Sequence, residues 1–239
     1  PPAHRPELRR AMSTIRKVGV CGAGGTMGAG IAIVAARAGF EVVRHDVSDT
    51  GLDRVMRDTA GFFGKSVERG KMTAEARDAV LGRMSSATTL NGLAGCDLVI
   101  EAVFEDLSVK QALLRALHPI LPDHAIIASN TSTLSITEIA SGCGREDRVV
   151  GMHFCLPAQL MRLIEMSPGV NTSDATFQAA WDWTVAAGQQ PVRTQDKPGF
   201  ILNALLVPFN NDAIRLVEAG VASPADVDLS VKKGLGYRM

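Results

Sequence analysis

The sequence predicts an α/β fold in which a mostly parallel sheet is followed by a region made only of helices. Short apolar runs rich in Val and Ile alternate with longer segments of helical period from Arg16 to Pro198, and no strand-like run follows Pro198. Strands that are buried on both faces and connected through helices form parallel sheets. We therefore expect an α/β domain over residues 13–195 and a helical domain over 196–239, preceded by a disordered tail over 1–12.

The individual elements follow from periodicity and from the residues at their ends. Thr73 and Ser173 stand where helix N-caps belong, and Gly39 stands where a left-handed residue stops a helix. A long helix over 200–218, which could kink at Pro208, is followed by a helix that begins at Pro224. Before these, the pattern predicts strands over 17–21, 41–45, 97–103, 125–129, 149–154 and 160–166, and helices over 26–38, 52–69, 74–84, 108–121 and 174–187.

The composition indicates a soluble globular protein whose partners are small molecules. The 239 residues are 46% hydrophobic, and 25 basic residues balance 25 acidic ones, so no charged field attracts nucleic acid or an anionic membrane. The four cysteines form no C-x-x-C pair, which argues against a metal site and favours a reducing cytoplasm. No apolar run has the length of a transmembrane helix, and no signal peptide is recognisable.

A glycine-rich turn joins the first predicted strand to the first helix, and Asp46 follows the second strand. Amides of such a turn, at the positive end of a helix, bind a pyrophosphate, and a carboxylate after the second strand accepts both ribose hydroxyls. Asp46 would repel a 2′-phosphate, which favours NAD over NADP. A simple tight strand-to-helix connection is the alternative. The predicted cofactor residues are Gly22, Gly24, Gly25, Thr26, Met27, Gly28 and Asp46.

A histidine and a carboxylate, His153 and Glu165, lie on two neighbouring strand-like runs. Together with the neutral hydrogen-bonding side chains of Ser132 and Asn203, this pair suits the removal of a proton from a hydroxyl. His153 would be the base, Glu165 would orient it and stabilise its imidazolium, and the other two would position the reacting oxygen. The structural alternatives are a core histidine for His153 and a helix cap for Ser132.

Several motifs occur in one order along the chain, and together they resemble those of the 3-hydroxyacyl-CoA dehydrogenase family from about Arg16 to the last residue. The resemblance implies a Rossmann-type NAD-binding domain joined to a helical domain that mediates dimerisation, and oxidation of the L-3-hydroxyl of an acyl thioester. The motifs are the Gly22 to Gly28 turn, Glu101-Ala102-Val103-Phe104-Glu105, Ser129-Asn130-Thr131-Ser132, Gly151-Met152-His153-Phe154, Glu165, Pro198-Gly199-Phe200 and Asn203.

The same resemblance implies roles for further residues. Asn130, Glu105 and Lys110 match positions near the nicotinamide end and the ribose of NAD. For Glu105 and Lys110 the alternative is an acid at a helix start with a solvated lysine beside it. Independently of the resemblance, Lys65 lies on a predicted helix with Arg57 and Arg69 at multiples of four residues, so it could meet a coenzyme A phosphate as a substrate-binding residue, or it could belong to a solvated helix face.

Three departures from the family pattern carry expectations of their own. Gly24-Gly25 adds one residue to the glycine turn, Cys155-Leu156-Pro157 replaces an Asn-Pro sequence beside the site, and relatives continue beyond Met239. We therefore expect an altered turn, an altered substrate pocket and a partial helical domain that forms a homodimer. We expect an acyl thioester of coenzyme A as the substrate, and a hydroxyacyl group on an acyl carrier protein of secondary metabolism is the alternative. A catalytically weak binding protein is the alternative of another class.

Overall fold

The computed structural model describes residues 14–237, which divide into two units at the bond between Pro198 and Gly199. The boundary lies three residues beyond the one expected from the sequence. The expected tail over residues 1–12 lies outside the described residues. None of the helices within 14–237 combines the length and the apolar character that a membrane-spanning segment requires.

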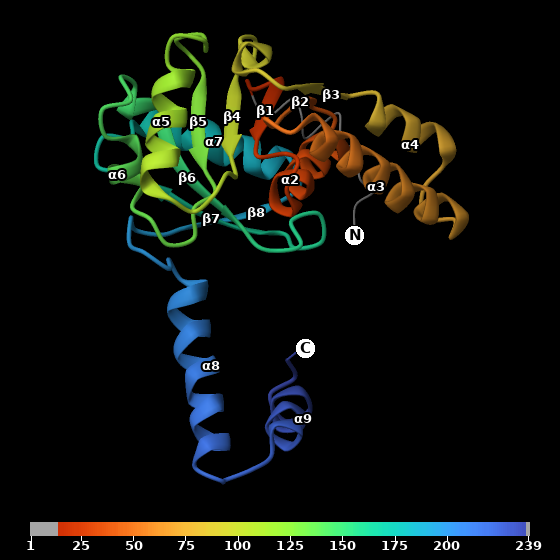
Figure 1. Cartoon of the computed structure of the whole chain (residues 1–239), viewed down its shortest axis with the longest axis vertical. Helices are drawn as coiled ribbons and strands as arrows, with labels where there is room; N and C mark the ends of the chain where they lie inside the picture. The colour runs from red at the N-terminus through yellow and green to blue at the C-terminus, as the bar shows by residue number, and fades with distance from the viewer. Residues whose placement is uncertain (1–13, 238–239) are drawn as a thin grey trace. The chain divides into compact units, whose positions relative to one another are not determined.

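The first unit is built on one eight-stranded sheet with the strand order β3-β2-β1-β4-β5-β6-β7-β8 (Figure 1). The strands from β3 to β6 run parallel, β7 runs antiparallel to β6, and β8 runs parallel to β7. The strands are β1 (Lys17–Cys21), β2 (Glu41–His45), β3 (Met84–Ala87), β4 (Leu98–Glu101), β5 (Ile126–Ser129), β6 (Val149–Phe154), β7 (Leu163–Pro168) and β8 (Gln190–Arg193).

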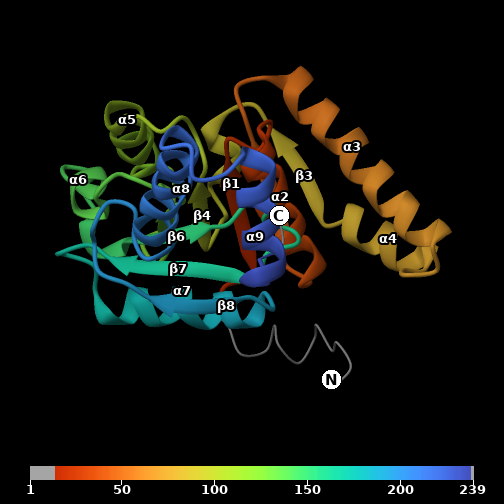
Figure 2. The same ribbon diagram turned by 90° about the horizontal axis from the view of Figure 1, so that it is seen from below.

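Helices cover both faces of this sheet, as Figures 1 and 2 show. One apolar core joins the sheet to α2, α3 and α7, with Phe40 and Trp183 among its largest side chains, and a second core joins the other face to α5 and α6. A sheet buried on both faces explains why its central strands contain almost only apolar residues. The helices are α2 (Thr26–Arg37), α3 (Asp49–Glu68), α4 (Ala74–Leu81), α5 (Leu107–Leu117), α6 (Ile136–Ala140) and α7 (Asp174–Ala186).

The local signals at helix ends act as predicted. The hydroxyl of Thr73 accepts a hydrogen bond from the amide of Ala76, and that of Ser173 accepts one from the amide of Thr176. Gly39, which follows Ala38, the C-cap residue of α2, has a φ of 95°, in the left-handed region that ends a helix.

Some predicted elements are wrong or incomplete. The helix expected over 74–84 ends at Leu81, because β3 begins at Met84 and pairs with β2. The strand expected over 160–166 begins at Leu163 and runs to Pro168. β3, β8 and the short helix α6 were not predicted, and the antiparallel direction of β7 was not recognised.

The second unit consists of α8 (Leu202–Glu218) and α9 (Pro224–Gly234). Pro208 lies inside α8, which continues through it, and the hydroxyl of Ser223 caps the start of α9. No residue of α8 is buried. The apolar stripe of this helix is therefore largely in contact with solvent.

Candidate functional site

The carboxyl ends of four neighbouring parallel strands bring the predicted site residues to one edge of the sheet. In the strand register, Cys21 of β1 lies beside Glu101 of β4, Glu101 beside Ser129 of β5, and Ser129 beside Gly151 of β6. The glycine turn follows Cys21 directly, and His153 lies two residues after Gly151. Ligands of open parallel sheets bind at this edge. With three inter-strand steps, the turn and the histidine strand are about 14 Å apart.

The glycine turn is compact and leaves no room for side chains at its two ends. Gly22 has a φ of 79°, and a Cβ on it would lie 2.5 Å from the carbonyl oxygen of Ala102. A Cβ on Gly28 would overlap the carbonyl oxygen of Gly22. The amide of Gly25 donates to the carbonyl of Gly22 over 3.1 Å, so the additional glycine is accommodated inside the turn.

The start of α2 is free to receive an anion, and Asp46 lies beside the same turn. Gly25, the N-cap residue of α2, makes no side-chain cap hydrogen bond, and the first turn of the helix contains no acidic residue. Asp46 accepts hydrogen bonds from the amides of Gly24, over 2.9 Å, and Ser48, over 3.0 Å. Amides at an uncapped helix start, which donate to the pyrophosphate, and a carboxylate after the second strand, which accepts from the ribose hydroxyls, are the groups that a dinucleotide requires.

Ser132, His153 and Glu165 form one chain of contacts. His153 Nδ1 lies 2.7 Å from Glu165 Oε2, and His153 Nε2 lies 3.1 Å from Ser132 Oγ. β6 and β7 place His153 and Glu165 directly opposite each other, and Glu165 is completely buried. Because a carboxylate only accepts, Nδ1 of the neutral ring carries the hydrogen and Nε2 keeps its lone pair toward Ser132. His153 is therefore not a core histidine bonded to backbone.

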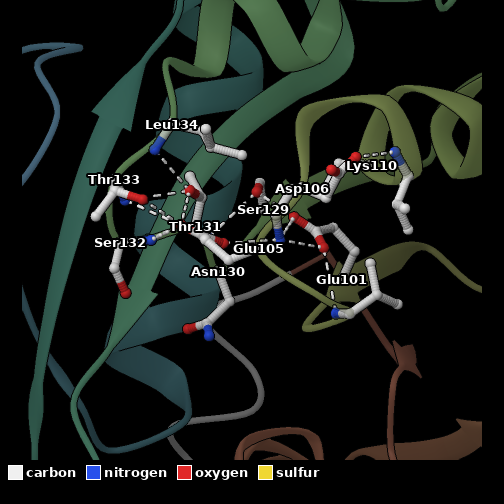
Figure 3. Close-up of polar contacts among 12 residues, drawn as sticks. Glu101, Glu105, Asp106, Lys110, Ser129, Asn130, Thr131, Ser132, Thr133 and Leu134 are labelled. Carbon is white, nitrogen blue, oxygen red and sulfur yellow. Dashed lines mark hydrogen bonds and ion pairs between the residues drawn. The ribbon is translucent and has the colours of Figure 1, made fainter.

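Ser132 lies in a loop that Glu105 anchors (Figure 3). Glu105 Oε1 accepts hydrogen bonds from the amides of Ser132 (2.8 Å) and Thr133 (3.0 Å) and from the hydroxyls of Thr131 (2.5 Å) and Thr133 (3.0 Å). Partial burial by itself raises the pKa of Glu105, but the Thr131 hydroxyl, the Lys110 ammonium and the two amides outweigh it and lower the pKa to about 2. Glu105 is thus an ionised anchor.

Ser132 is not a helix cap, which was the structural alternative for it. Ser135 caps α6 by accepting from the amide of Glu138, so the Ser132 hydroxyl is available to His153. Asn130, predicted near the nicotinamide, accepts a hydrogen bond from the amide of Phe154 over 2.9 Å and so joins this loop to the end of β6. Its role toward a cofactor stays a prediction.

Lys110 is not solvated, contrary to one of the two expectations for it. Its side chain is 1% exposed, and Nζ lies 2.9 Å from each carboxylate oxygen of Glu101 and 3.2 Å from Glu105 Oε2. Glu101, which received no role from the sequence, is completely buried. Two signals could have revealed the pair: a carboxylate ends an otherwise apolar strand, and Lys110 shares the helical spacing of Leu114 and Leu117, the other buried residues of α5.

Asn203 belongs to the second unit, and Lys65 belongs to α3. Asn203 lies in the first turn of α8, in the second unit, so its predicted substrate contact stays a prediction. Lys65 is exposed near the end of α3. Its contact with a coenzyme A phosphate also stays a prediction.

Ionised Glu105 makes the stability of the fold depend on pH. Its pKa is lower in the folded chain than the ordinary value of 4.5, so its contribution is present above pH 4.5 and is lost as the pH falls toward about 2. We expect Glu105→Gln to lower the free energy of unfolding at neutral pH by about 1 kcal/mol. The difference from the parent should shrink across that window in urea unfolding at a series of pH values. A difference of constant size would contradict this, and exposed Glu41→Gln is the control.

Comparisons with known proteins identify relatives along the whole described chain. Residues 17–197 match the family model described as the 3-hydroxyacyl-CoA dehydrogenase NAD-binding domain, and residues 199–239 match that of the C-terminal domain. A probable 3-hydroxybutyryl-CoA dehydrogenase of Deinococcus radiodurans is 42% identical over 93% of this chain and 80% of its own. The human mitochondrial hydroxyacyl-coenzyme A dehydrogenase is 40% identical over 94% of this chain and 73% of its own.

A solved structure shows the same fold. The crystal structure of (S)-3-hydroxybutyryl-CoA dehydrogenase PaaH1 from Ralstonia eutropha superposes with a TM-score of 0.89 at 36% sequence identity. The match covers 94% of this chain and 79% of that chain. The fold is therefore shared along almost the entire chain.

Proposed function

Because the chain belongs to the 3-hydroxyacyl-CoA dehydrogenase family, we propose that it oxidises the 3-hydroxyl of an L-3-hydroxyacyl-CoA with NAD and catalyses the reverse reduction of a 3-ketoacyl-CoA. The observation that supports this most is the contact chain from Ser132 through His153 to buried Glu165. It lies at the edge of the sheet that also holds the glycine turn. A proton acceptor and a dinucleotide cradle on one edge are what oxidation of an alcohol needs.

The side chains divide the proton chemistry among them. His153 Nε2 takes the proton of the substrate hydroxyl, and Glu165 stabilises the imidazolium that forms and keeps the ring in the productive tautomer. The Ser132 hydroxyl, which faces the same nitrogen, positions the reacting oxygen. Bound NAD⁺ supplies the acceptor for the hydride that leaves C3. In the reverse direction the imidazolium of His153 returns the proton to the carbonyl oxygen.

The residues around the glycine turn fit the cofactor. The free amides at the start of α2, from Thr26 and Met27 onward, would hold the pyrophosphate, and Asp46 would hold the adenine ribose. Gly22 and Gly28 carry no side chain, so the pyrophosphate can approach the backbone of the turn closely. A Cβ on either residue would also collide with backbone atoms of the protein.

The nature of the acyl carrier follows the relatives. The curated relatives are named for coenzyme A thioesters, so an acyl carrier protein as the carrier has no support among them. The four thiols, Cys21, Cys96, Cys143 and Cys155, are all unpaired, which supports a reducing compartment such as the cytoplasm.

A direct assay tests the proposal: the purified chain should consume NADH with acetoacetyl-CoA and form NADH with L- but not D-3-hydroxybutyryl-CoA. Absence of turnover with coenzyme A thioesters of several chain lengths would refute it.

The carboxylate of Asp46 should give a strong preference for NAD over NADP. Each hydrogen bond from a ribose hydroxyl to a carboxylate contributes about 1.5–3 kcal/mol, so Asp46→Ala should lower the affinity for NADH by about tenfold or more. Arg44 cannot offset the repulsion of a 2′-phosphate, because it is buried and its guanidinium donates to the Leu52 carbonyl and the Ser86 hydroxyl.

This preference is checked by measuring kcat/KM with both cofactors. Asp49→Ala, which removes an exposed carboxylate from the first turn of α3, is the matched control and should leave both values unchanged. Equal kcat/KM values of the parent with NADH and NADPH would show that Asp46 does not bind the ribose hydroxyls.

We also propose that the second unit mediates self-association as a homodimer. Ile201, Leu205 and Ile214 have exposed fractions of 43%, 68% and 55%, an unusual amount of apolar surface for one helical region. Sedimentation velocity at micromolar concentrations should therefore detect a dimer. Leu205→Lys should shift the protein toward monomer, whereas Asn211→Lys, which adds the same charge at an exposed polar position, should not. A parent that sediments only as a monomer would refute this proposal.

A further inference from the structure

Glu101 ends β4 in a position where a carboxylate is costly. It is completely buried, and burial raises its pKa, an effect that the Lys110 ammonium and the Ser129 hydroxyl oppose. Both carboxylate oxygens contact Lys110 Nζ at 2.9 Å, and Oε1 also accepts a hydrogen bond from the Ser129 hydroxyl. A buried ion pair rarely adds stability over an apolar pair of the same volume. Stability therefore does not explain why the Glu101–Lys110 pair occurs at this edge of the sheet.

Lys110 connects Glu101 to the loop that carries Ser132. The ammonium that Glu101 holds also lies 3.2 Å from Glu105 Oε2. The other oxygen of Glu105 holds the loop through the amides of Ser132 and Thr133 (Figure 3). Lys110 is thus fixed between two carboxylates, and one of them holds the backbone of a residue that contacts His153.

Glu101 also holds the start of this loop directly. Its side chain binds the hydroxyl of Ser129, the last residue of β5, and its backbone carbonyl accepts from the amide of Asn130 over 2.9 Å. A continuous series of hydrogen bonds and ion pairs therefore runs from Glu101 through Lys110 and Glu105 to Ser132, and from there to His153 Nε2.

We propose that Glu101 is a positioning residue of the reaction, whose buried carboxylate fixes Lys110 and through it the Glu105 anchor that presents Ser132 to His153. This rests on the proposed function, because it assigns a purpose to the placement of Ser132. A neutral amide at position 101 offers a single acceptor oxygen and turns an NH₂ group toward Lys110 or Ser129. Lys110 then moves toward Glu105, and the carboxylate of Glu105 rotates away from the amides of the loop.

The first experiment is a double-mutant cycle. Glu101→Gln should lower kcat with acetoacetyl-CoA by about ten- to hundredfold, with the KM for NADH nearly unchanged, because a small displacement of a positioning group has effects of this size. In the Ser132→Ala background the same substitution should change kcat by less than about twofold, since the residue through which it acts is already lost. Effects of the two substitutions that multiply, or an unchanged kcat for Glu101→Gln, would overturn the proposal.

The second experiment tests the Glu105 anchor by a measurement that does not depend on enzymatic activity. Amide hydrogen exchange in the segment 129–134 should accelerate in Glu101→Gln, because the amides of Ser132 and Thr133 lose a fixed acceptor. Asp97→Asn is the matched control: it removes a carboxylate that accepts from backbone amides at the opposite end of β4, and it should leave both exchange in this segment and kcat unchanged. Unchanged exchange in Glu101→Gln would overturn the proposal even if no substrate were turned over.

Two further outcomes are distinguishable. If Glu101→Gln does not fold, Glu101→Gln with Lys110→Met removes both buried charges; it should fold, with low kcat and fast exchange of the loop. Parental kcat in this folded double variant would overturn the proposal. An inactive parent whose loop exchange still depends on Glu101 would refute the proposed function and leave the anchor in place.

Discussion

His153→Gln should lower kcat by roughly a hundredfold or more, in both directions of the reaction. Nε2 of His153 faces the Ser132 hydroxyl, while Nδ1 is held by Glu165, so the ring presents one nitrogen for proton transfer. Glutamine can keep a hydrogen bond to either neighbour, but its amide neither takes nor releases a proton near neutral pH. The KM for NADH should change little, because the glycine turn and Asp46 belong to other strands.

The measurement is steady-state kinetics at saturating NADH, with NADH fluorescence as the binding readout. His124→Gln is the matched control, since His124 is 65% exposed and pairs with Asp97 at the opposite edge of the sheet. It should retain parental turnover. If His153→Gln remained within a few-fold of the parent, the proton acceptor would have to be another group.

The part of the fold that the sequence predicts is the part buried on both faces. β1, β2 and β6 have the bounds that the sequence predicts, and at least four residues of each are buried. β3 (Met-Ser-Ser-Ala) and β8 (Gln-Pro-Val-Arg) are the two edge strands, half exposed and poor in apolar residues. Such edge strands form because they pair with a neighbouring strand, and this pairing produces no hydrophobic periodicity in their own sequence. Periodicity therefore does not predict them.

At the site, too, some contacts follow from local sequence patterns and others depend on residues far apart in the sequence. His153 and Glu165 were predicted as a pair from neighbouring strands, and the register of β6 and β7 places them opposite each other. The Glu105 anchor joins a residue that precedes α5 to a loop 26 to 28 positions further along the chain. That distance in sequence hides the contact from any local pattern. Lys110 has the helical spacing of the buried residues of α5, but a positively charged side chain is ordinarily expected in solvent. The local pattern therefore does not indicate that Lys110 is buried.

Glu165→Gln should lower kcat by about a hundredfold or more, although it removes no proton acceptor and adds no volume. Glu165 is completely buried, with Oε2 2.7 Å from His153 Nδ1. If the amide oxygen faces Nδ1, the ring keeps its tautomer, but the imidazolium that forms during oxidation has lost its counter-ion. If the amide nitrogen faces Nδ1, the proton of the ring moves to Nε2, and the base is blocked. Either orientation slows proton transfer.

This effect must be separated from a loss of folding. Glutamine has nearly the same shape as glutamate, and removing a buried charge also removes its desolvation cost, so the thermal midpoint should stay close to that of the parent. A folded variant with intact NADH binding and low kcat would place the carboxylate in the proton-transfer machinery. A variant with parental kcat would show that His153 acts without a charged partner, and the role of Glu165 would then be limited to orienting the ring.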